Sequence, residues 1–288
     1  MSLLSLYRAG FRKSVRSFRP IVLLWIISLA GSLLVVAPLE RNIGSILDGT
    51  LASELLYDGF DIDVFADIMH AIMPALAAFS ITFLLVTAIL FLANTFITAG
   101  LYRILAGNWK KPYRRRIFLR GADRGFGGFL FVALATGALI VITVLLIVIV
   151  PAVILTAAGA TFQVIRYTGL ATGFLVILAL PVFLLTADYA RAMLTADKYL
   201  SPFRAMTGAA RSIMKRKFFR LWIAMMLIIL FSALAGFAGM KLVVYSKASA
   251  GAGLFVLLIV SQLFVFLKSW IRVFRYGTVT AIFESVKD

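Results

Sequence analysis

Six long runs without a charged side chain constrain the fold of this chain more than any other feature. They cover residues 20–39, 71–102, 125–165, 167–187, 221–240 and 248–267. About 20 apolar residues in a helix cross the roughly 30 Å of hydrocarbon in a bilayer. Transmembrane β-strands would instead show segments of about 10 residues with alternating polarity, and this sequence lacks that pattern. The runs therefore predict an all-α integral membrane protein with six transmembrane helices.

We expect a single transmembrane domain over residues 1–288. Its six predicted spans cover about 20–39, 74–102, 126–158, 168–190, 219–243 and 251–276. The run 125–165 is too long for one crossing. We expect its helix to run from about Phe126 to Ala158, to loosen near Pro151 and to be followed by an outer turn, because proline removes a helical hydrogen bond.

Lysine and arginine concentrate in four of the segments that flank the spans. Residues 1–19, 103–124, 191–220 and 268–287 hold 25 of the 29 Lys and Arg, and seven of the 12 Asp and Glu lie between the first two spans. Segments rich in Lys and Arg stay in the cytoplasm. We therefore predict that both termini and the two long basic loops are cytoplasmic.

The formal net charge is +17, although 62% of the residues are hydrophobic and cysteine is absent. This excess of positive charge suits an anionic membrane leaflet better than a nucleic acid, so we expect no nucleic-acid partner. A docking surface for a cytoplasmic partner is the alternative. The predicted contacts with anionic lipid headgroups are Arg12, Lys13, Arg16, Arg114, Arg115, Arg116, Lys215, Arg216 and Lys217.

Three basic segments resemble one another. They are "LYRAGFRKSVRSFRPIVLLW" (6–25), "PYRRRIFLRGADRGFGGF" (112–129) and "PFRAMTGAARSIMKRKFFRLW" (202–222). In the third, Phe203, Met206, Ala210 and Ile213 recur at helical spacing, which predicts an amphipathic helix at the membrane interface. We therefore expect three helical hairpins, each preceded by such a helix, in repeats 1–103, 104–191 and 192–288.

Glycine and other small residues predict where helices pack closely within the chain, with dimerisation as the alternative. Pairs four residues apart within the spans are Ala133/Gly137, Gly169/Gly173, Ser232/Gly236 and Ala235/Gly239. The glycines of "GADRGFGGF" (121–129) lack the phosphate-loop pattern. We interpret them as positions that permit close approach between helices.

The stretch "LLYDGFDIDVFADIMHAIMP" (55–74) holds the only histidine. Asp63, Asp67 and His70 would share one helix face, and Asp61 lies nearby. A charged rim beside an apolar helix is the favoured interpretation, since a calcium-loop pattern is missing and zinc commonly requires more than one His here. A divalent-cation site, a site for a cationic partner and a catalytic site are the alternatives. We expect no cofactor.

Asp188 lies near the end of the fourth span. Lys268, Arg272 and Arg275 share one face of the sixth span by their spacing. A carboxylate withdrawn from water needs a cation, so we predict a structural ion pair of Asp188 with Lys268 or Arg272. A local pair with Arg191, or exposure to water, is the alternative.

Four stretches carry a resemblance to a known group of proteins. They are "RAGFRKSVRSFRPIVLLWIISLAGSLL", "DGFDIDVFADI", "DYARAMLTADKYLSPFRAMTGAAR" and "SQLFVFLKSWIRVFRYG". The chain resembles an uncharacterised family of bacterial six-span inner-membrane proteins. It is more distantly similar to the membrane domain of some glycerophosphodiester phosphodiesterases, whose catalytic barrel is absent. The resemblance implies the bacterial cytoplasmic (inner) membrane and no known reaction.

Ionisable side chains are nearly missing from the middle of the spans, which disfavours a proton-coupled carrier. We therefore predict a non-enzymatic membrane protein, either an accessory or scaffold subunit with an integral membrane protein as partner, or a lipid-organising protein. A transporter, lipid flippase or channel is the first alternative. A membrane enzyme acting on lipids is the second.

Overall fold

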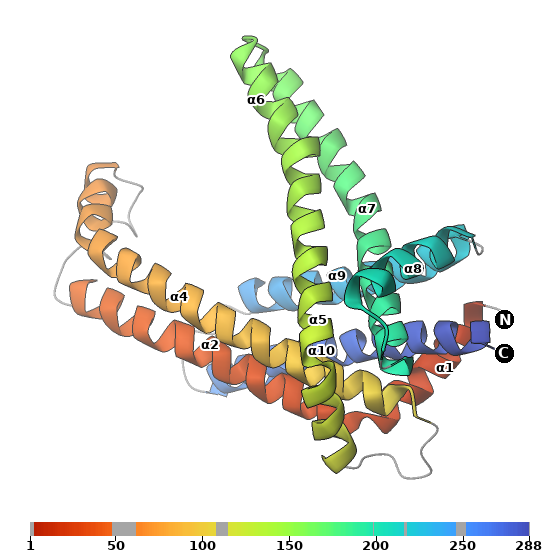
Figure 1. Cartoon of the computed structure of the whole chain (residues 1–288). Helices are drawn as coiled ribbons and strands as arrows, with labels where there is room; N and C mark the ends of the chain where they lie inside the picture. Colours follow the sequence, from red (N-terminus) through yellow and green to blue (C-terminus); the bar gives the residue numbers. More distant parts are fainter. Residues whose placement is uncertain are drawn as a thin grey trace. The chain divides into compact units, whose positions relative to one another are not determined.

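The computed structural model describes residues 3–47, 62–107, 115–197, 199–215, 218–245 and 252–287, and every regular element in them is a helix (Figure 1). Six helical stretches of this described part are long and apolar enough to cross a membrane. They are Phe18–Pro38, Phe79–Leu105, Arg115–Ala157, Phe162–Ala196, Phe218–Leu242 and Phe255–Ser285. The prediction of an all-α, multi-pass membrane protein is confirmed.

The helices form two compact units. Residues 23–94 make one unit, from most of α2 (Phe18–Leu47) and α4 (Ile62–Leu105). In this unit the two helices approach closely at Gly31, where an added Cβ would collide with the side chain of Leu90. The unit boundaries fall inside α2 and α4 and are not those of the proposed repeats, which stay a prediction.

The second unit contains residues 1–22 and 95–288. Its complete elements are α1 (Leu3–Arg16), α5 (Arg115–Val144), η1 (Leu145–Ile149), α6 (Val150–Ala157), α7 (Phe162–Ala196), α8 (Pro202–Lys215), α9 (Phe218–Tyr245) and α10 (Ala252–Lys287). α10 packs against α1, α7 and α9, and α7 also packs against α5 and α8.

The buried core of this unit lies among the parts of the helices that are rich in Arg and Lys. Leu6, Ala187, Ala209, Met225 and Val279 belong to one buried cluster. Mid-helix apolar side chains are exposed instead: the exposed fraction is 62% for Leu146 and 63% for Leu170. Exposed apolar side chains of this kind suit helices that lipid surrounds, where burial between helices brings little hydrophobic gain.

The third span, Arg115–Ala157, changes its winding before Pro151. α5 passes without interruption into the π-helical turn Leu145–Ile149 and then into α6. Proline lacks an N–H and its ring collides with the carbonyl four residues earlier, and a π-turn absorbs that mismatch. The predicted loosening near Pro151 is therefore confirmed. A turn follows at Ala158–Thr161, in which Gly159 has a φ of 71°.

Two of the three expected basic helices are separate elements. α1 ends at Arg16, one residue before α2, and α8 precedes α9. The second basic segment differs, because α5 begins at Arg115 and continues unbroken to Val144. Within the described residues no separate helix precedes this span, since "GADRGFGGF" contains glycines but no proline and stays within one helix.

Only one of the five glycines in the predicted small-residue pairs lies at a close helix contact within the described chain. An added Cβ would meet nothing within 4 Å at Gly137, Gly169, Gly173 or Gly236, and only Gly239 is tight, with Phe264 at 2.9 Å. Packing within the chain was therefore wrongly predicted for these four glycines, and their role in dimerisation stays a prediction. Other close approaches lie near the basic ends of the helices, as at Gly121, which the glycine-rich segment did predict.

Candidate functional site at the basic end of the helices

Asp188 is the most deeply buried charge of the described chain, with 0% of its side chain exposed. It lies two turns before the end of α7. Its Oδ1 accepts a hydrogen bond from Nη1 of Arg191 at 2.8 Å. Its Oδ2 lies 2.8 Å from Nε of Arg275 on α10, in an ion pair that lacks hydrogen-bond alignment. One carboxylate thus joins a cation of its own helix to a cation of another span.

The partner of Asp188 on α10 corrects the predicted ion pair. The prediction named Lys268 or Arg272, and the ion pair is made by Arg275, the third basic residue of the same face. Lys268 is exposed, about two helical turns away along α10. The local alternative, Arg191, is also present. An ion pair between the fourth and sixth spans was predicted correctly. The predicted alignment of α10 along α7 was wrong, because Arg275 and not Lys268 or Arg272 lies beside Asp188.

Two tyrosine rings lie beside this ion cluster, defined as Asp188, Arg191 and Arg275. The guanidinium of Arg275 lies 5.2 Å from the ring centre of Tyr276, a cation–π distance. Tyr276 contacts Tyr102, with ring centres 5.1 Å apart. Tyr102 is fully buried, and its hydroxyl has no hydrogen-bond partner among the described residues. Because Asp188 and Tyr102 are fully buried, the charge interactions of the cluster are stronger than they would be in water.

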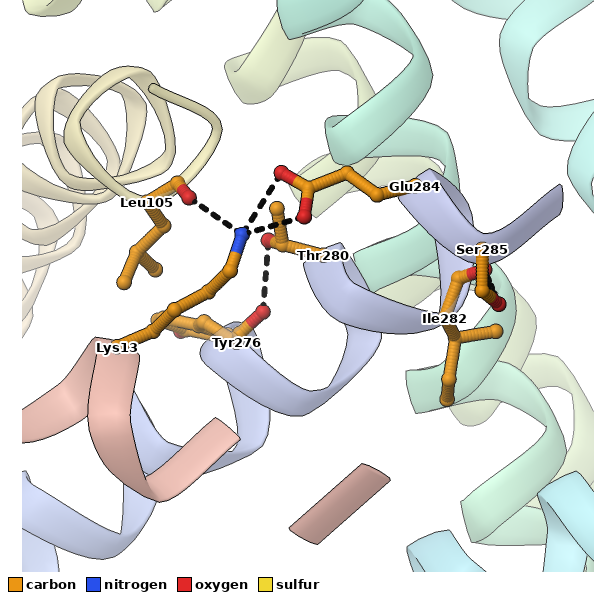
Figure 2. Close-up of polar contacts among 7 residues, drawn as sticks. All are labelled: Lys13, Leu105, Tyr276, Thr280, Ile282, Glu284 and Ser285. Atoms are coloured by element: carbon orange, nitrogen blue, oxygen red, sulfur yellow. Dashed lines mark hydrogen bonds and ion pairs between the residues drawn. The ribbon is translucent and has the colours of Figure 1, made fainter. Parts of the chain in front are cut away.

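A second polar contact joins three helices close to their basic ends. Figure 2 shows Nζ of Lys13 between the carbonyl of Leu105 and the carboxylate of Glu284. The distances are 2.8 Å to the carbonyl oxygen and 2.7 Å to each carboxylate oxygen. Leu105 is the last residue of α4, whose final carbonyls have no helical partner. Lys13 therefore caps α4 and pairs α1 with α10.

Backbone proximity holds α1 against α10. An added Cβ at Gly277 would lie 2.8 Å from the carbonyl oxygen of Gly10, and one at Gly10 would collide with Thr278. On the same packed face of α1, the hydroxyl of Tyr7 donates to the carbonyl of Ala224 on α9 at 3.0 Å, and burial raises the pKa of Tyr7. The N-terminal helix is thus docked on both α9 and α10.

A cavity of about 580 Å³ lies where α4 ends, α5 begins and α7 ends. Four of its lining residues are arginines: Arg103, Arg116, Arg120 and Arg124. The sequence analysis counted Arg103, Arg120 and Arg124 only as a topology signal, and Arg116 also as a lipid headgroup contact. The spacing of Arg116, Arg120 and Arg124, four residues apart beside Gly121 and Gly125, was the available sign that they share a face next to a close helix contact.

The predicted lipid contacts are found in different settings. Arg12, Arg16, Arg115, Arg116 and Lys215 are exposed. Lys13 is turned inward to Glu284 instead. Arg114, Arg216 and Lys217 lie outside the described residues.

The acidic stretch is described only in part. Asp61 lies outside the described residues. Asp63, Asp67 and His70 belong to α4, but the placement of their side chains is not described. In the rest of the described chain no three His, Asp or Glu side chains gather in a way that could hold a metal ion. The cation-site alternative for residues 55–74 stays a prediction.

Comparison of the chain with protein-family models, curated proteins and solved structures finds no match.

Proposed function

We propose that the protein is a non-enzymatic, lipid-organising protein of the bacterial cytoplasmic membrane, which gathers anionic phospholipids at its basic, cytoplasmic end. The observation that carries this proposal is the surface of two short helices. In both α1 and α8, one face is packed on the protein and the exposed face combines arginine with large apolar side chains.

In α1 the packed face contains Leu6 and Gly10, and the exposed face contains Arg8, Phe11 and Arg12. The exposed fraction is 78% for Leu4 and 49% for Phe11. Side chains of this kind suit the boundary between headgroups and acyl chains, with apolar groups inserted and guanidinium groups at the phosphates.

α8 repeats the arrangement with a different register from the predicted one. Ala205, Ala209 and Ile213 are buried in the protein, whereas Phe203 and Met214 are 67% and 75% exposed. Phe203 was expected to share a face with Ile213. Because the face of α8 with Ala205 and Ala209 packs on the protein, Phe203 and Met214 on the exposed face can contact the bilayer. We infer that both helices lie in the membrane interface.

Each Lys or Arg close to an anionic leaflet contributes about 1 kcal/mol of attraction. A patch of membrane cut out around the protein with an amphipathic copolymer should therefore contain more anionic phospholipid than the bulk membrane. Replacing Arg8, Arg12 and Arg211 with glutamine should remove most of this enrichment, and replacing them with lysine should retain it. Lipid quantification by mass spectrometry measures both.

A matched control removes three exposed charges elsewhere, at Arg41, Arg166 and Lys241. This variant should keep the enrichment. Patches with the composition of the bulk membrane, or equal losses in both triple variants, would exclude the proposed function.

A further inference from the structure

The arginine cavity is the cavity lined by residues of α4, α5 and α7. Its positive charge is separate from the ion cluster, because Asp188, Arg191 and Arg275 do not line it. Among the described residues it is lined by Arg103, Arg116, Arg120, Arg124, Phe129 and Thr195, together with glycine and small or aliphatic side chains. Four of these residues are cations and none is an acid. A cavity with this lining attracts anions.

The guanidinium groups are available for a ligand. Among the described residues, Arg116, Arg120 and Arg124 make no ion pair and no hydrogen bond through their side chains. Arg103 is held in place by the end of α7, because its Nη1 lies 3.4 Å from the carbonyl oxygen of Thr195 and donates to it. The nearest acid on α5, Asp123, is exposed and does not line the cavity.

Two glycines of α5 bring the arginines of α4 and α5 together. An added Cβ at Gly121 would lie 2.5 Å from Cβ of Arg103, and one at Gly125 would lie 3.2 Å from Cβ of Ala99. The helices therefore touch at their backbones, and the long side chains on either side of the contact surround the cavity. Phe129, which is 2% exposed, gives it an apolar part.

We infer that this cavity binds a diphosphate anion, and that in the membrane the anion is the headgroup of a phospholipid with two phosphates. The planar guanidinium group of arginine donates paired hydrogen bonds to two phosphate oxygens. Four guanidinium groups can balance more negative charge than the single charge of one phosphodiester. The volume lies within the range of about 300–1,000 Å³ that ligand pockets occupy. Basic pockets between membrane helices on the cytoplasmic side bind such headgroups.

The lipid source of the ligand rests on the proposed function, but the diphosphate chemistry does not. A soluble diphosphate compound would present the same groups. The test therefore uses the full-length protein, purified and stripped of lipid in a detergent with an uncharged headgroup. One arm titrates cardiolipin against phosphatidylglycerol at equal total charge. The other titrates inorganic pyrophosphate against chloride at equal ionic strength.

Thermal unfolding temperature is the measurement in both arms. We expect cardiolipin to give a saturable rise that phosphatidylglycerol does not give. The double variant R120Q/R124Q should raise the half-saturating concentration of cardiolipin at least about tenfold, since hydrogen bonds to charged groups contribute about 1.5–3 kcal/mol each. R166Q, at an exposed arginine outside the lining, should leave this concentration unchanged, and R120K/R124K should restore part of the lost affinity.

Saturation by pyrophosphate but not by cardiolipin would overturn the lipid assignment and keep the diphosphate site. No saturable rise in either arm, or equal losses of affinity in R166Q and R120Q/R124Q, would overturn the site itself. A negative result for the cavity would not affect the predicted enrichment of anionic lipid by Arg8, Arg12 and Arg211. The two proposals can therefore be refuted separately.

Discussion

Among single residues, Asp188 has the strictest electrostatic requirements. Its carboxylate is fully buried, and each oxygen lies 2.8 Å from a different arginine, one on α7 and one on α10. A buried charge that loses its partner keeps its desolvation cost without the attraction that compensated it. The stability of the second unit should therefore depend on the cluster as a set rather than on any one contact.

Asp188→Asn should lower the free energy of unfolding by about 3–5 kcal/mol, because it leaves two cations without an anion. Arg275→Gln should cost less, since Arg191 still pairs with Asp188. In a double-mutant cycle followed by thermal unfolding in detergent, the two changes should be strongly non-additive. Lys268→Gln is the control, and coupling of Asp188 to Lys268 equal to that with Arg275 would contradict the ion cluster.

Replacing Lys13 should destabilise the protein more than replacing its ion-pair partner, Glu284. Glu284 is 44% exposed, and exposed pairs contribute about 0–1 kcal/mol, so Glu284→Gln should have a small effect that shrinks further in high salt. Lys13→Met also removes the hydrogen bond to the carbonyl of Leu105. It should lower the unfolding temperature more, and keep doing so in high salt. Equal effects of both variants at every salt concentration would show that the cap contributes nothing.

At the scale of helices, the crossing of α1 and α10 depends on two glycines that face each other. Gly277→Ala places a methyl group against the carbonyl of Gly10, and the backbone there can yield only by moving a helix. The expected cost is about 1–3 kcal/mol, as for other overpacked sites.

Gly137→Ala is the matched control for this crossing. An added Cβ meets nothing within 4 Å there, and alanine is the better helix former by up to about 1 kcal/mol. The thermal unfolding temperature should therefore fall for Gly277→Ala and stay level or rise for Gly137→Ala. The reverse order would contradict the described crossing.

The sequence predicted helices well and their mutual packing poorly, for a physical reason. Span positions follow from hydropathy, which is a local property, and the irregularity near Pro151 follows from the chemistry of one residue. Which face of a span meets another helix is not local: Ala133/Gly137 and Gly10/Gly277 both offer small side chains, but only the second pair lies in a contact. In lipid the apolar faces look alike, so composition cannot choose between them.

The candidate site was visible only in parts. Asp188 was found because a lone carboxylate at a span end requires a cation, but the choice among Lys268, Arg272 and Arg275 depends on how far α10 slides along α7. The arginine cavity was missed because Arg103 joins it from another helix. Its three remaining arginines lie on one helix, and their four-residue spacing beside glycines could have indicated a shared face.

For the whole molecule, the basic helices, the ion cluster, the Lys13 cap and the arginine cavity all belong to residues 1–22 and 95–288, among the segments that hold most of the Lys and Arg. Positive charge keeps such segments on the cytoplasmic side of a membrane. If they share that side, α1, α8 and the cavity all face the same anionic leaflet, as lipid organisation requires.

Sidedness can be measured directly because the chain contains no cysteine. Single cysteines at Thr161, in the turn before α7, and at Ser201, just before α8, are both at exposed positions. An impermeant maleimide added to intact spheroplasts should label the Thr161→Cys variant and label the Ser201→Cys variant only after the membrane is opened. Labelling of Ser201→Cys from outside, with protection of Thr161→Cys, would place the basic end on the wrong side and contradict the proposed role in organising cytoplasmic-leaflet lipid.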